Sequence, residues 1–185
     1  LKEGLNIYDI QKEFSTAKNA QSAENFIKLT RDENLISLAG VPASVKKEHR
    51  SLEGFLFPET YSFSKYDPVS KIVKNMLEEF RKRALPILQE HSWATSPEGL
   101  YKLLVLASIV EKESGNKDEQ PLVASVFWNR LNKKMRLQSD PTTIYGLLPN
   151  FDGNIRRKDL ITPTPFNTYT IASLPPTPIS NPGET

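Results

Sequence analysis

The 185-residue sequence contains no cysteine and only two histidines, His49 and His91. The absence of cysteine excludes disulfides, thiol nucleophiles and cysteine-ligated metals. The two histidines lie far apart in the sequence, and no motif supplies either of them with the partners of a catalytic triad or a metal site. We therefore expect no metal, and any chemistry must depend on carboxylates, hydroxyls, amides or lysine.

A strong excess of one charge is also lacking, since 24 Lys and Arg residues stand against 22 Asp and Glu residues and the formal net charge is +2. This balance provides no broad field that would gather nucleic acid or anionic lipid, so we expect no nucleic-acid partner. The sequence has no apolar run of membrane-spanning length and does not open with a signal peptide. A hydrophobic fraction of 38% with 25% charged residues is typical of one folded domain, with or without a small appendage.

Helical periodicity is clearest in three segments. Asp67 can cap the first and Pro68 fits its first turn, while Pro86 should kink or end it. Ser96, followed by a proline, begins the second, which is apolar on nearly every face and should therefore be central. The third covers "PLVASVFWNRLNKK", and the side chains that it should bury are Leu122, Val123, Val126, Phe127 and Leu131.

The two ends of the chain differ in character. Short helical pieces in "NIYDIQKEFS" and in "SAENFIKLTRD", with Ser22 as N-cap, predict an N-terminal helical subdomain over residues 1–51. The second domain, residues 52–185, begins with an extended or turning segment, and 8 of the 14 prolines lie between Pro141 and Pro182. Because proline excludes long helices there, we expect ordered loops and two short strands, "MRLQS" and "NTYTIA". The predicted fold class is α+β, with central buried helices, short strands and Pro-rich ordered loops that form a cleft.

Two glutamates end the central helix in "LASIVEKESG". Glu111 and Glu113 are about 200° apart around a helix, so only one of them can face a given cleft. Glu113 continues the more apolar face, that of Leu106, Ile109 and Val110. Burial and the negative end of the helix dipole both favour the protonated form of a carboxyl group, as a general acid for a glycosidic oxygen requires. The alternative is that both glutamates merely end a buried helix.

Neutral polar groups and aromatic rings gather in two stretches after residue 134. "MRLQSDPTTIYGL" contains hydroxyl, amide and carboxyl groups close together, and "FNTYT" adds more. Such a mixture suits a sugar, whose hydroxyls need hydrogen bonds and whose ring faces stack. Taken singly, each of these residues could equally cap or pin a loop; together they indicate a cleft lining.

Several motifs in this order resemble the MltG/YceG-like endolytic murein transglycosylases: "LEGFLFPETY", "LASIVEKES", "ASVFWNRL", "MRLQSDPTTIYG" and "FNTYTIASLPPTPISNPG". The resemblance runs from residue 52 to the end, and "LKEGLNIYDI" is similar to the start of the family's catalytic region. It implies a lysozyme-like catalytic site and a YceG-like catalytic domain that is C-terminally truncated at Thr185. It also implies a periplasmic location, with a single-pass anchor in the inner membrane that this chain does not include. The implied partners are peptidoglycan glycan strands, penicillin-binding proteins and other proteins of cell-wall synthesis.

The same resemblance implies a role for each candidate site residue. Glu113 matches the family's catalytic glutamate, and Glu113 followed by Ser114 is similar to the Glu-Ser pair of lysozyme-like lytic transglycosylases. The implied reaction cleaves the β-1,4 bond between N-acetylmuramic acid and N-acetylglucosamine without water and leaves 1,6-anhydro ends. Phe166 departs from the family, which usually has tyrosine at this position. The expected substrate-binding residues are Gln138, Ser139, Asp140, Tyr145, Asn167 and Tyr169, with Glu59 of "FPETY" as a further candidate that could equally serve a turn.

Two alternatives stay open beside this interpretation. The first is a non-catalytic peptidoglycan-binding or division-scaffold module. The second is a pyridoxal-dependent lyase, because YceG-like proteins have carried an aminodeoxychorismate lyase label. Pyridoxal chemistry needs a lysine in a pocket and a phosphate cradle, and the sequence has no Gly-rich phosphate loop and no motif that supports Lys112. We therefore expect no cofactor.

Overall fold

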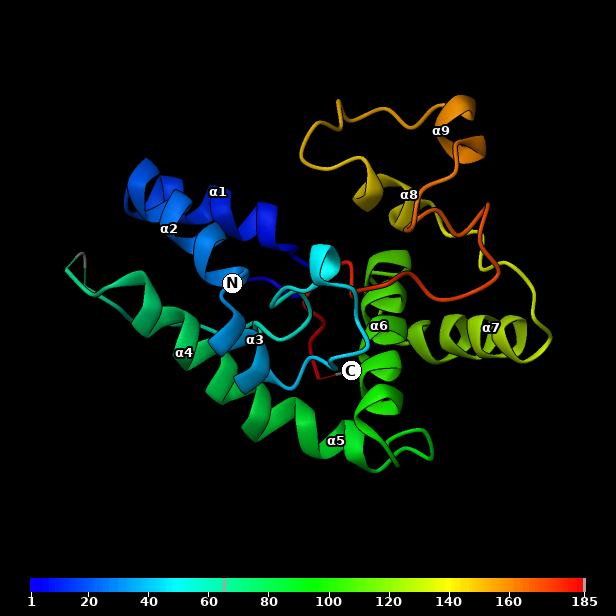
Figure 1. The fold of residues 1–185 in the computed structure, drawn as a ribbon, viewed down its shortest axis with the longest axis horizontal. Helices are drawn as coiled ribbons and strands as arrows, with labels where there is room; N and C mark the ends of the chain where they lie inside the picture. The colour runs from blue at the N-terminus through cyan, green and yellow to red at the C-terminus, as the bar shows by residue number, and fades with distance from the viewer. Residues whose placement is uncertain (65, 185) are drawn as a thin grey trace.

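Helix α6 (Pro97–Glu113) lies at the centre of the computed structural model, which describes residues 1–64 and 66–184 (Figure 1). The hydroxyl of Ser96 accepts a hydrogen bond from the N–H of Gly99 at 3.1 Å, so the predicted cap is confirmed. Leu104 and Ile109 are 1% and 0% exposed. The helix ends where Ser114 adopts an extended backbone. The expectation of a central, buried helix is therefore correct.

Three helices form the N-terminal part: α1 (Ile7–Ala17), α2 (Ala20–Thr30) and α3 (Glu33–Ala39). A short 3₁₀ turn follows at Lys47–His49. Asn6 caps α1, and Asn19 rather than Ser22 caps α2, so the second helix begins earlier than predicted. The Asn19 side chain accepts from the N–H of Ser22 at 2.8 Å, which places Ser22 inside the first turn. Phe14 of α1 and Phe26 of α2 stack with ring centroids 4.9 Å apart and join the two helices.

The next helical run contains α4 (Val69–Glu79), a π-helical turn (Phe80–Ala84) and α5 (Leu85–Gln89). Pro68 is the N-cap residue of α4 rather than its first helical residue, so the helix begins one residue later than predicted. Asp67 accepts from the N–H of Ser64 instead of capping the helix. The expected effect of Pro86 is visible as the wider turn before it. Proline has no N–H and its ring crowds the carbonyl one turn earlier, and a π turn relieves that crowding.

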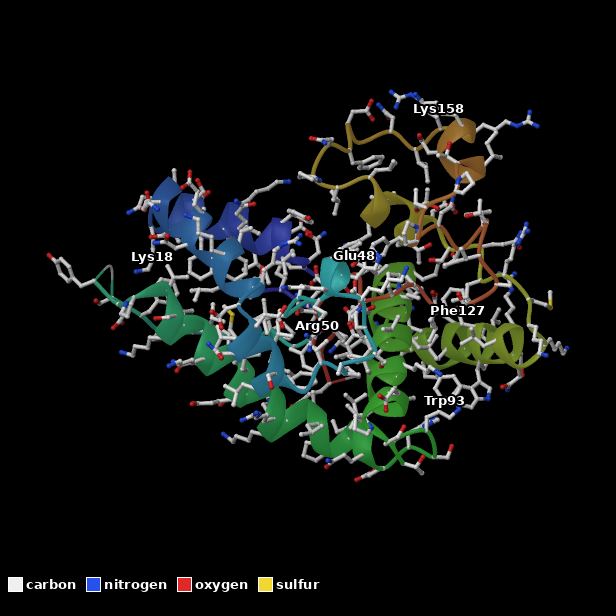
Figure 2. All side chains as sticks on the ribbon, in the orientation of Figure 1. Lys18, Glu48, Arg50, Trp93, Phe127 and Lys158 are labelled. Carbon is white, nitrogen blue, oxygen red and sulfur yellow. The ribbon has the colours of Figure 1, made fainter. Side chains whose placement is uncertain are left out.

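Helix α7 (Gln120–Asn132) packs beside the C-terminal half of α6 (Figure 1). Phe127 is 5% exposed and faces the core, as predicted. Leu122 and Val126 are 69% and 43% exposed, so their predicted burial is wrong. The reason is that α7 has a protein neighbour on one side only, and the apolar side chains on its other side meet solvent. Figure 2 labels Phe127 of α7 and Trp93 in the same region of the molecule.

Two short helices, α8 (Asp140–Gly146) and α9 (Arg157–Ile161), interrupt the Pro-rich C-terminal part. Figure 2 shows Lys158 at its outer edge. Within residues 1–64 and 66–184 the structure contains no β-strand, so the predicted α+β class is wrong and the fold is all-helical with long ordered loops.

The two expected strands are extended and turning loop segments instead. They do approach each other, because the N–H of Gln138 donates to the carbonyl of Thr168 at 3.1 Å. The next N–H, that of Ser139, goes to the Thr168 hydroxyl at 3.0 Å, and the N–H of Thr170 turns back to the carbonyl of Asn167 at 2.9 Å. A ladder needs successive backbone pairs, and here side chains and a turn use those groups.

A buried polar cluster joins the beginning, middle and end of the chain. Asn181 accepts from the N–H groups of Gly54 and Leu56, both at 2.9 Å, and donates to Glu53 at 2.8 Å. The segment predicted to be extended or turning, residues 52–63, is thus an irregular loop whose buried backbone is satisfied by a distant side chain.

One hydrophobic core includes side chains from both sides of the predicted boundary at residues 51 and 52, among them Ile7 and Ile109. The division into two domains stays a prediction. None of the helices in the described part of the chain has the length and apolar character needed to cross a membrane.

Candidate active site

Glu113 is the last residue of α6, and its side chain is exposed. The expectation that it is buried beside Leu106, Ile109 and Val110 is therefore wrong: those three residues are buried, but the helix leaves the core one turn before Glu113. The carboxylate is held by a neighbour from a distant part of the chain, because the hydroxyl of Ser139 donates to its Oε2 atom at 2.9 Å.

Ser139 is 1% exposed, and both its backbone N–H and its backbone carbonyl are hydrogen-bonded. Its N–H donates to the hydroxyl of Thr168 at 3.0 Å, and its carbonyl accepts from the hydroxyl of Thr142 at 2.7 Å. These two threonine hydroxyls lie 2.8 Å apart and bond to each other. Because all these groups are buried and paired, Ser139 presents its own hydroxyl to Glu113 in one orientation.

Asp140 and Tyr169 form a second pair, with the tyrosine hydroxyl donating to Asp140 Oδ1 at 2.6 Å. This hydrogen bond, followed by partial burial and the nearby charges of Asp140 and Glu113, raises the pKa of Tyr169 to about 12. The phenol is therefore a neutral donor at any physiological pH. Asp140 directly follows Ser139, which donates to Glu113, so the pair lies near the glutamate.

Gln138 has a left-handed backbone, with φ of 55°. A residue with a side chain rarely adopts this conformation, and when it does the surrounding structure must enforce it. Here the neighbours Leu137 and Ser139 are 0% and 1% exposed, while Gln138 itself is exposed. Two buried anchors thus turn the Gln138 side chain outward, next to the residue that holds Glu113.

The structure does not bring Tyr145 to this cluster. Its hydroxyl donates to Glu53 at 2.8 Å, and its ring lies 5.0 Å from that of Phe166. Burial, together with the charge of Glu53, raises the pKa of Tyr145 well above its ordinary value. The hydroxyl is used inside the protein, and the expected role of Tyr145 in substrate binding stays a prediction. Phe166, where the family usually has tyrosine, packs against Tyr145 in the same cluster, so the hydroxyl that this chain lacks would lie there.

Asn167 is also an internal residue, with 0% exposure. Its amide N–H₂ donates to the carbonyls of Asp159, Leu160 and Thr162 at 3.1, 3.0 and 2.8 Å. Its carbonyl oxygen accepts from the hydroxyl of Thr143 at 3.1 Å. The side chain holds the α9 loop in place with all of its polar atoms, and its expected role in substrate binding stays a prediction.

Glu59 lies in a different environment from Glu113. Its carboxylate forms an ion pair with Arg83 of the π-helical turn and accepts from the N–H of Thr60. These two hydrogen bonds, the one from Thr60 first, lower its pKa. The arrangement matches the turn-stabilising alternative for "FPETY".

Glu111 lies on the other side of α6, as the 200° offset predicts. It is partly buried, and its carboxylate accepts from the N–H of Gly183 and from Gln120 at 3.4 Å. Burial, and secondarily the charge of Glu3, raises its pKa. Of the two glutamates, Glu111 has the more apolar surroundings, whereas Glu113 has the hydroxyl and carboxyl neighbours that a glycan site needs.

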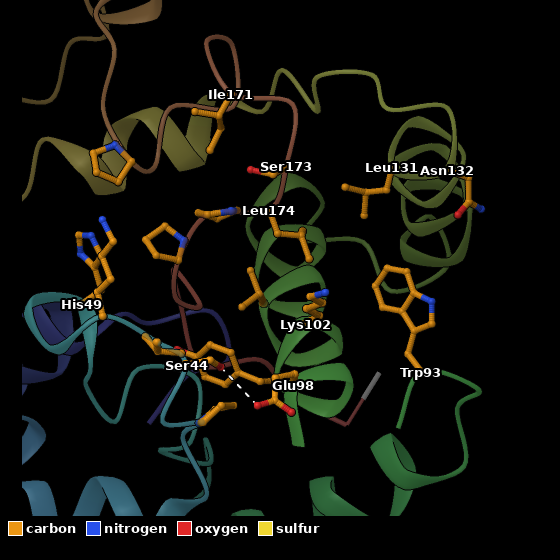
Figure 3. A pocket seen from close by; sticks show the side chains of 18 residues that line it. Ser44, His49, Trp93, Glu98, Lys102, Leu131, Asn132, Ile171, Ser173 and Leu174 are labelled. Atoms are coloured by element: carbon orange, nitrogen blue, oxygen red, sulfur yellow. Dashed lines mark hydrogen bonds between the residues drawn. The ribbon is translucent and has the colours of Figure 1, made fainter. Parts of the chain in front are cut away.

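Two large hollows flank α6, and neither is lined by Glu113. One, of about 680 Å³, lies along the α6 face that includes Tyr101, Lys102 and Val105 (Figure 3). The other, of about 640 Å³, lies between α5, α6 and α7 and includes Glu111. The candidate site at Glu113 is an open surface site beyond the first hollow.

Sequence reasoning missed Glu53, which is 0% exposed and accepts hydrogen bonds from the N–H of Ile7 at 3.0 Å, from Tyr145 and from Asn181. Burial raises its pKa to about 8, and those hydrogen bonds offset part of the effect. The signal that could have revealed it is a lone glutamate in "LEGFLF", where the residues on both sides are apolar.

The fold and the site together define an all-helical domain that displays one glutamate at the end of its central helix, beside an Asp–Tyr pair. The chain belongs to the YceG-like family, whose model matches residues 1–185. The resemblance seen in the sequence is thereby confirmed.

Curated relatives and a solved structure agree with this membership. The chain is 39% identical over 133 residues to an endolytic murein transglycosylase of Bacillus subtilis (strain 168), a match that covers 71% of this chain and 36% of the relative. It is 31% identical over 179 residues to an endolytic murein transglycosylase of Streptococcus pneumoniae serotype 2, covering 89% of this chain and 32% of the relative. The chain thus spans about a third of the length of these relatives.

A crystal structure of a yceG-like protein from Listeria monocytogenes has the same fold, with a TM-score of 0.75 and 29% identity. The match covers 100% of this chain and 62% of that one.

Proposed function

We propose that this chain is the catalytic region of an endolytic lytic transglycosylase that cleaves the glycan strands of peptidoglycan. The observation that carries the proposal is the position of Glu113, whose exposed carboxylate is held by Ser139 at 2.9 Å beside the Asp140–Tyr169 pair. The names of the two relatives, both endolytic murein transglycosylases, support the choice of substrate.

In the proposed mechanism Glu113 acts twice. It first donates a proton to the glycosidic oxygen of the bond between N-acetylmuramic acid and N-acetylglucosamine, so that the N-acetylglucosamine side leaves as an alcohol. The Glu113 carboxylate then accepts the proton of the muramic C6 hydroxyl, whose oxygen attacks its own anomeric carbon. The product is a 1,6-anhydro ring, and no water is consumed. Because the nucleophile belongs to the substrate, the second carboxylate of ordinary glycosidases is not required.

The neighbouring residues have separate roles in this proposal. Ser139 is a positioning residue, because it binds Oε2 of Glu113 and leaves Oε1 for the proton transfers. Asp140 and Tyr169 offer acceptor oxygens to the sugar hydroxyls, since the one phenolic proton is donated to Asp140, and the outward side chain of Gln138 adds an amide. Holding the glutamate in a single orientation is the kind of pre-organisation that raises the rate of proton transfer.

The proposed setting is the periplasmic face of the cytoplasmic membrane, with a single-pass anchor carried by a part of the protein outside this chain. Penicillin-binding proteins and other proteins of cell-wall synthesis are the proposed partners. These two points are supported by the family resemblance alone.

A non-catalytic peptidoglycan-binding module is the second candidate. The observation that favours it is the open position of Glu113, outside both large hollows. Such a module would bind strands and leave them intact.

Digestion of purified peptidoglycan by the full-length protein, followed by mass spectrometry of the products, distinguishes these functions. Anhydro-muramic ends are the expected result. Reducing muramic ends would make the protein a hydrolase, and strand binding without cleavage would favour the binding module.

A further inference from the structure

The hollow of about 680 Å³ beside α6, which we call the α6 hollow, has no role in the mechanism above. Its floor is α6, and Figure 3 shows Lys102 projecting from this helix between two walls. Ser44 and His49 stand on one wall, and Trp93 and Leu131 on the other. The segment over residues 171–176 closes one side.

The hollow and the candidate active site are built on two of the same elements. Lys102 and Glu113 are eleven positions apart on α6, which corresponds to three turns, the same side of the helix and a separation of about 16 Å along its axis. Tyr169 belongs to the site, while Ile171 and Ser173, in the same segment, line the hollow. At this spacing the hollow lies within a few sugar residues of a glycosidic bond held at Glu113.

The charges in the hollow favour an anionic ligand. The ammonium groups of Lys46 and Lys102 are exposed, and within residues 1–64 and 66–184 neither of them forms an ion pair. The one carboxylate of the lining, Glu98, accepts a hydrogen bond from Ser44 at 3.4 Å. With His49 neutral, two ammonium groups against one carboxylate leave a net positive charge.

The remaining lining is mostly apolar and includes Val45, Leu131 and Leu174. Among the polar side chains of the lining, Lys46, His49, Glu98 and Lys102 are charged or basic, and the neutral non-aromatic ones are Ser44, Asn132 and Ser173. A ligand with charges of its own therefore suits the hollow better than a neutral sugar. Two unpaired ammonium groups beside apolar side chains suit a short peptide with free carboxylates and small apolar side chains.

We propose that the α6 hollow binds the short acidic peptide attached to muramic acid in peptidoglycan, with Lys46 and Lys102 pairing with its carboxylates. This inference rests on the proposed function, because it takes the peptide to be part of the same substrate. A peptide held in the hollow fixes which glycosidic bond lies at Glu113, so peptide-bearing strands are preferred over bare glycan.

The test compares Lys46→Gln and Lys102→Gln in the full-length protein on two substrates, peptide-bearing strands and the same strands stripped by an amidase. Each variant should lower kcat/KM on peptide-bearing strands by about two- to fivefold, the range expected for one exposed ion pair. Cleavage of stripped strands should not change. The preference of the unaltered protein for peptide-bearing strands should shrink as salt is added, since salt screens such pairs. Lys74→Gln, an exposed lysine on α4, is the matched control.

An equal loss on both substrates would make the hollow a glycan subsite and overturn the proposal, and so would unchanged cleavage of peptide-bearing strands. A binding measurement keeps the proposal separate from the enzymatic one. The synthetic peptide N-acetyl-L-Ala-γ-D-Glu-L-Lys-D-Ala-D-Ala, whose N-terminus is blocked as it is in the strand and whose net charge is therefore negative, should bind the full-length protein. Lys46→Gln, Lys102→Gln and amidation of the peptide's carboxylates should each weaken this binding. If the protein cleaves no strand but binds this peptide in that manner, the catalytic proposal fails and the peptide site stands. If the peptide does not bind, the peptide site fails whatever the protein cleaves.

Discussion

The hydroxyl of Ser139 lies 2.9 Å from Oε2 of Glu113, although the two residues are 26 positions apart in the sequence. Glu113 ends the central helix and Ser139 immediately precedes α8, so this hydrogen bond links the two elements at the surface. The threonine pair behind Ser139 is fully buried, which means that the core of the protein sets the orientation of an exposed carboxylate.

Replacing each of the two neighbouring glutamates by glutamine, in separate variants, tests which of them is the catalytic acid. Glu113→Gln removes the transferable proton and should lower cleavage by about 100- to 10,000-fold, the usual cost of losing a general acid–base residue. Glu111→Gln should retain substantial activity, because Glu111 accepts hydrogen bonds from Gly183 and Gln120 on the opposite side of the helix. The rate of formation of anhydro ends measures both.

The contrary result would be informative, since Glu111 is the glutamate whose pKa burial raises. An inactive Glu111→Gln protein with an active Glu113→Gln protein would move the site to the apolar hollow between α5, α6 and α7. Circular dichroism of both variants serves as the control for folding.

Ser139→Ala should affect turnover more than binding. The substitution keeps the backbone hydrogen bonds to Thr142 and Thr168 and removes only the contact with Glu113. A carboxylate that is free to rotate loses the geometry of proton transfer, so kcat should fall by about 10- to 100-fold with a smaller change in KM. Ser180→Ala removes a similar buried hydroxyl contact, to the carbonyl of Ser108 at 3.0 Å, away from the site. That control should lower thermal stability and leave kcat unchanged; equal effects of the two variants on kcat would show that Ser139 has only a structural role.

The sequence predicted helices well where capping and periodicity agree, as at Ser96 of α6. It failed at residues 135–139 and 167–172, where the density of prolines excluded long helices and suggested short strands. The hydroxyl of Thr168 and the turn at Asn167 use the backbone groups that a ladder would need. That competition depends on residues brought together by the fold, so the local pattern cannot reveal it.

The candidate site was predictable to a similar extent. The motifs suggested both the grouping of Ser139, Asp140 and Tyr169 and the importance of Glu113, and the structure places these residues together. Tyr145 and Asn167 have the same chemistry, but their polar atoms form hydrogen bonds within the protein. Whether a polar side chain meets solvent or a buried backbone is decided by tertiary packing, and composition does not contain that information.

Glu53 should make the stability of the protein depend on pH. Burial raises its pKa from an ordinary 4.5 to about 8, so between these values the folded state binds a proton that the unfolded state releases. This contribution to the free energy of unfolding is fully present below pH 4.5 and is lost as the pH rises to 8, with a slope of at most about 1.4 kcal/mol per pH unit. Urea unfolding of the wild type and of Glu53→Gln across this range measures it, and the difference between the two proteins should change with pH.

Glu53→Gln should also be destabilising at pH 7, by about 1–3 kcal/mol. Donors from Ile7, Tyr145 and Asn181 converge on the two carboxyl oxygens, and an amide offers only one oxygen to them. Glu59→Gln is the matched control in the same segment, since Glu59 lies at the surface and its loss should change stability little. A Glu53→Gln protein as stable as the wild type would contradict the role of this cluster.

Asp140→Asn should lower the pKa of Tyr169. The variant keeps an oxygen that can accept from the phenol but removes the charge that contributes to raising this pKa to about 12. The value should fall toward the ordinary 10.0, which NMR titration of labelled tyrosine can follow, with Tyr169→Phe used to assign the signal. An unchanged pKa would show that the Asp140–Tyr169 contact does not form in solution.

Gln138 allows the backbone and the side chain to be tested separately. Because its φ of 55° is unfavourable for a residue with a Cβ atom, Gln138→Gly should raise the free energy of unfolding or leave it unchanged, whereas Gln138→Ala retains the backbone strain and should not stabilise the protein. Both substitutions remove the amide that we assign to substrate, so both should raise KM for glycan strands by a similar factor. If Gln138→Gly and Gln138→Ala instead kept the KM of the wild type, the side chain would not contact the sugar, and the left-handed turn would serve only to place Ser139 against Glu113.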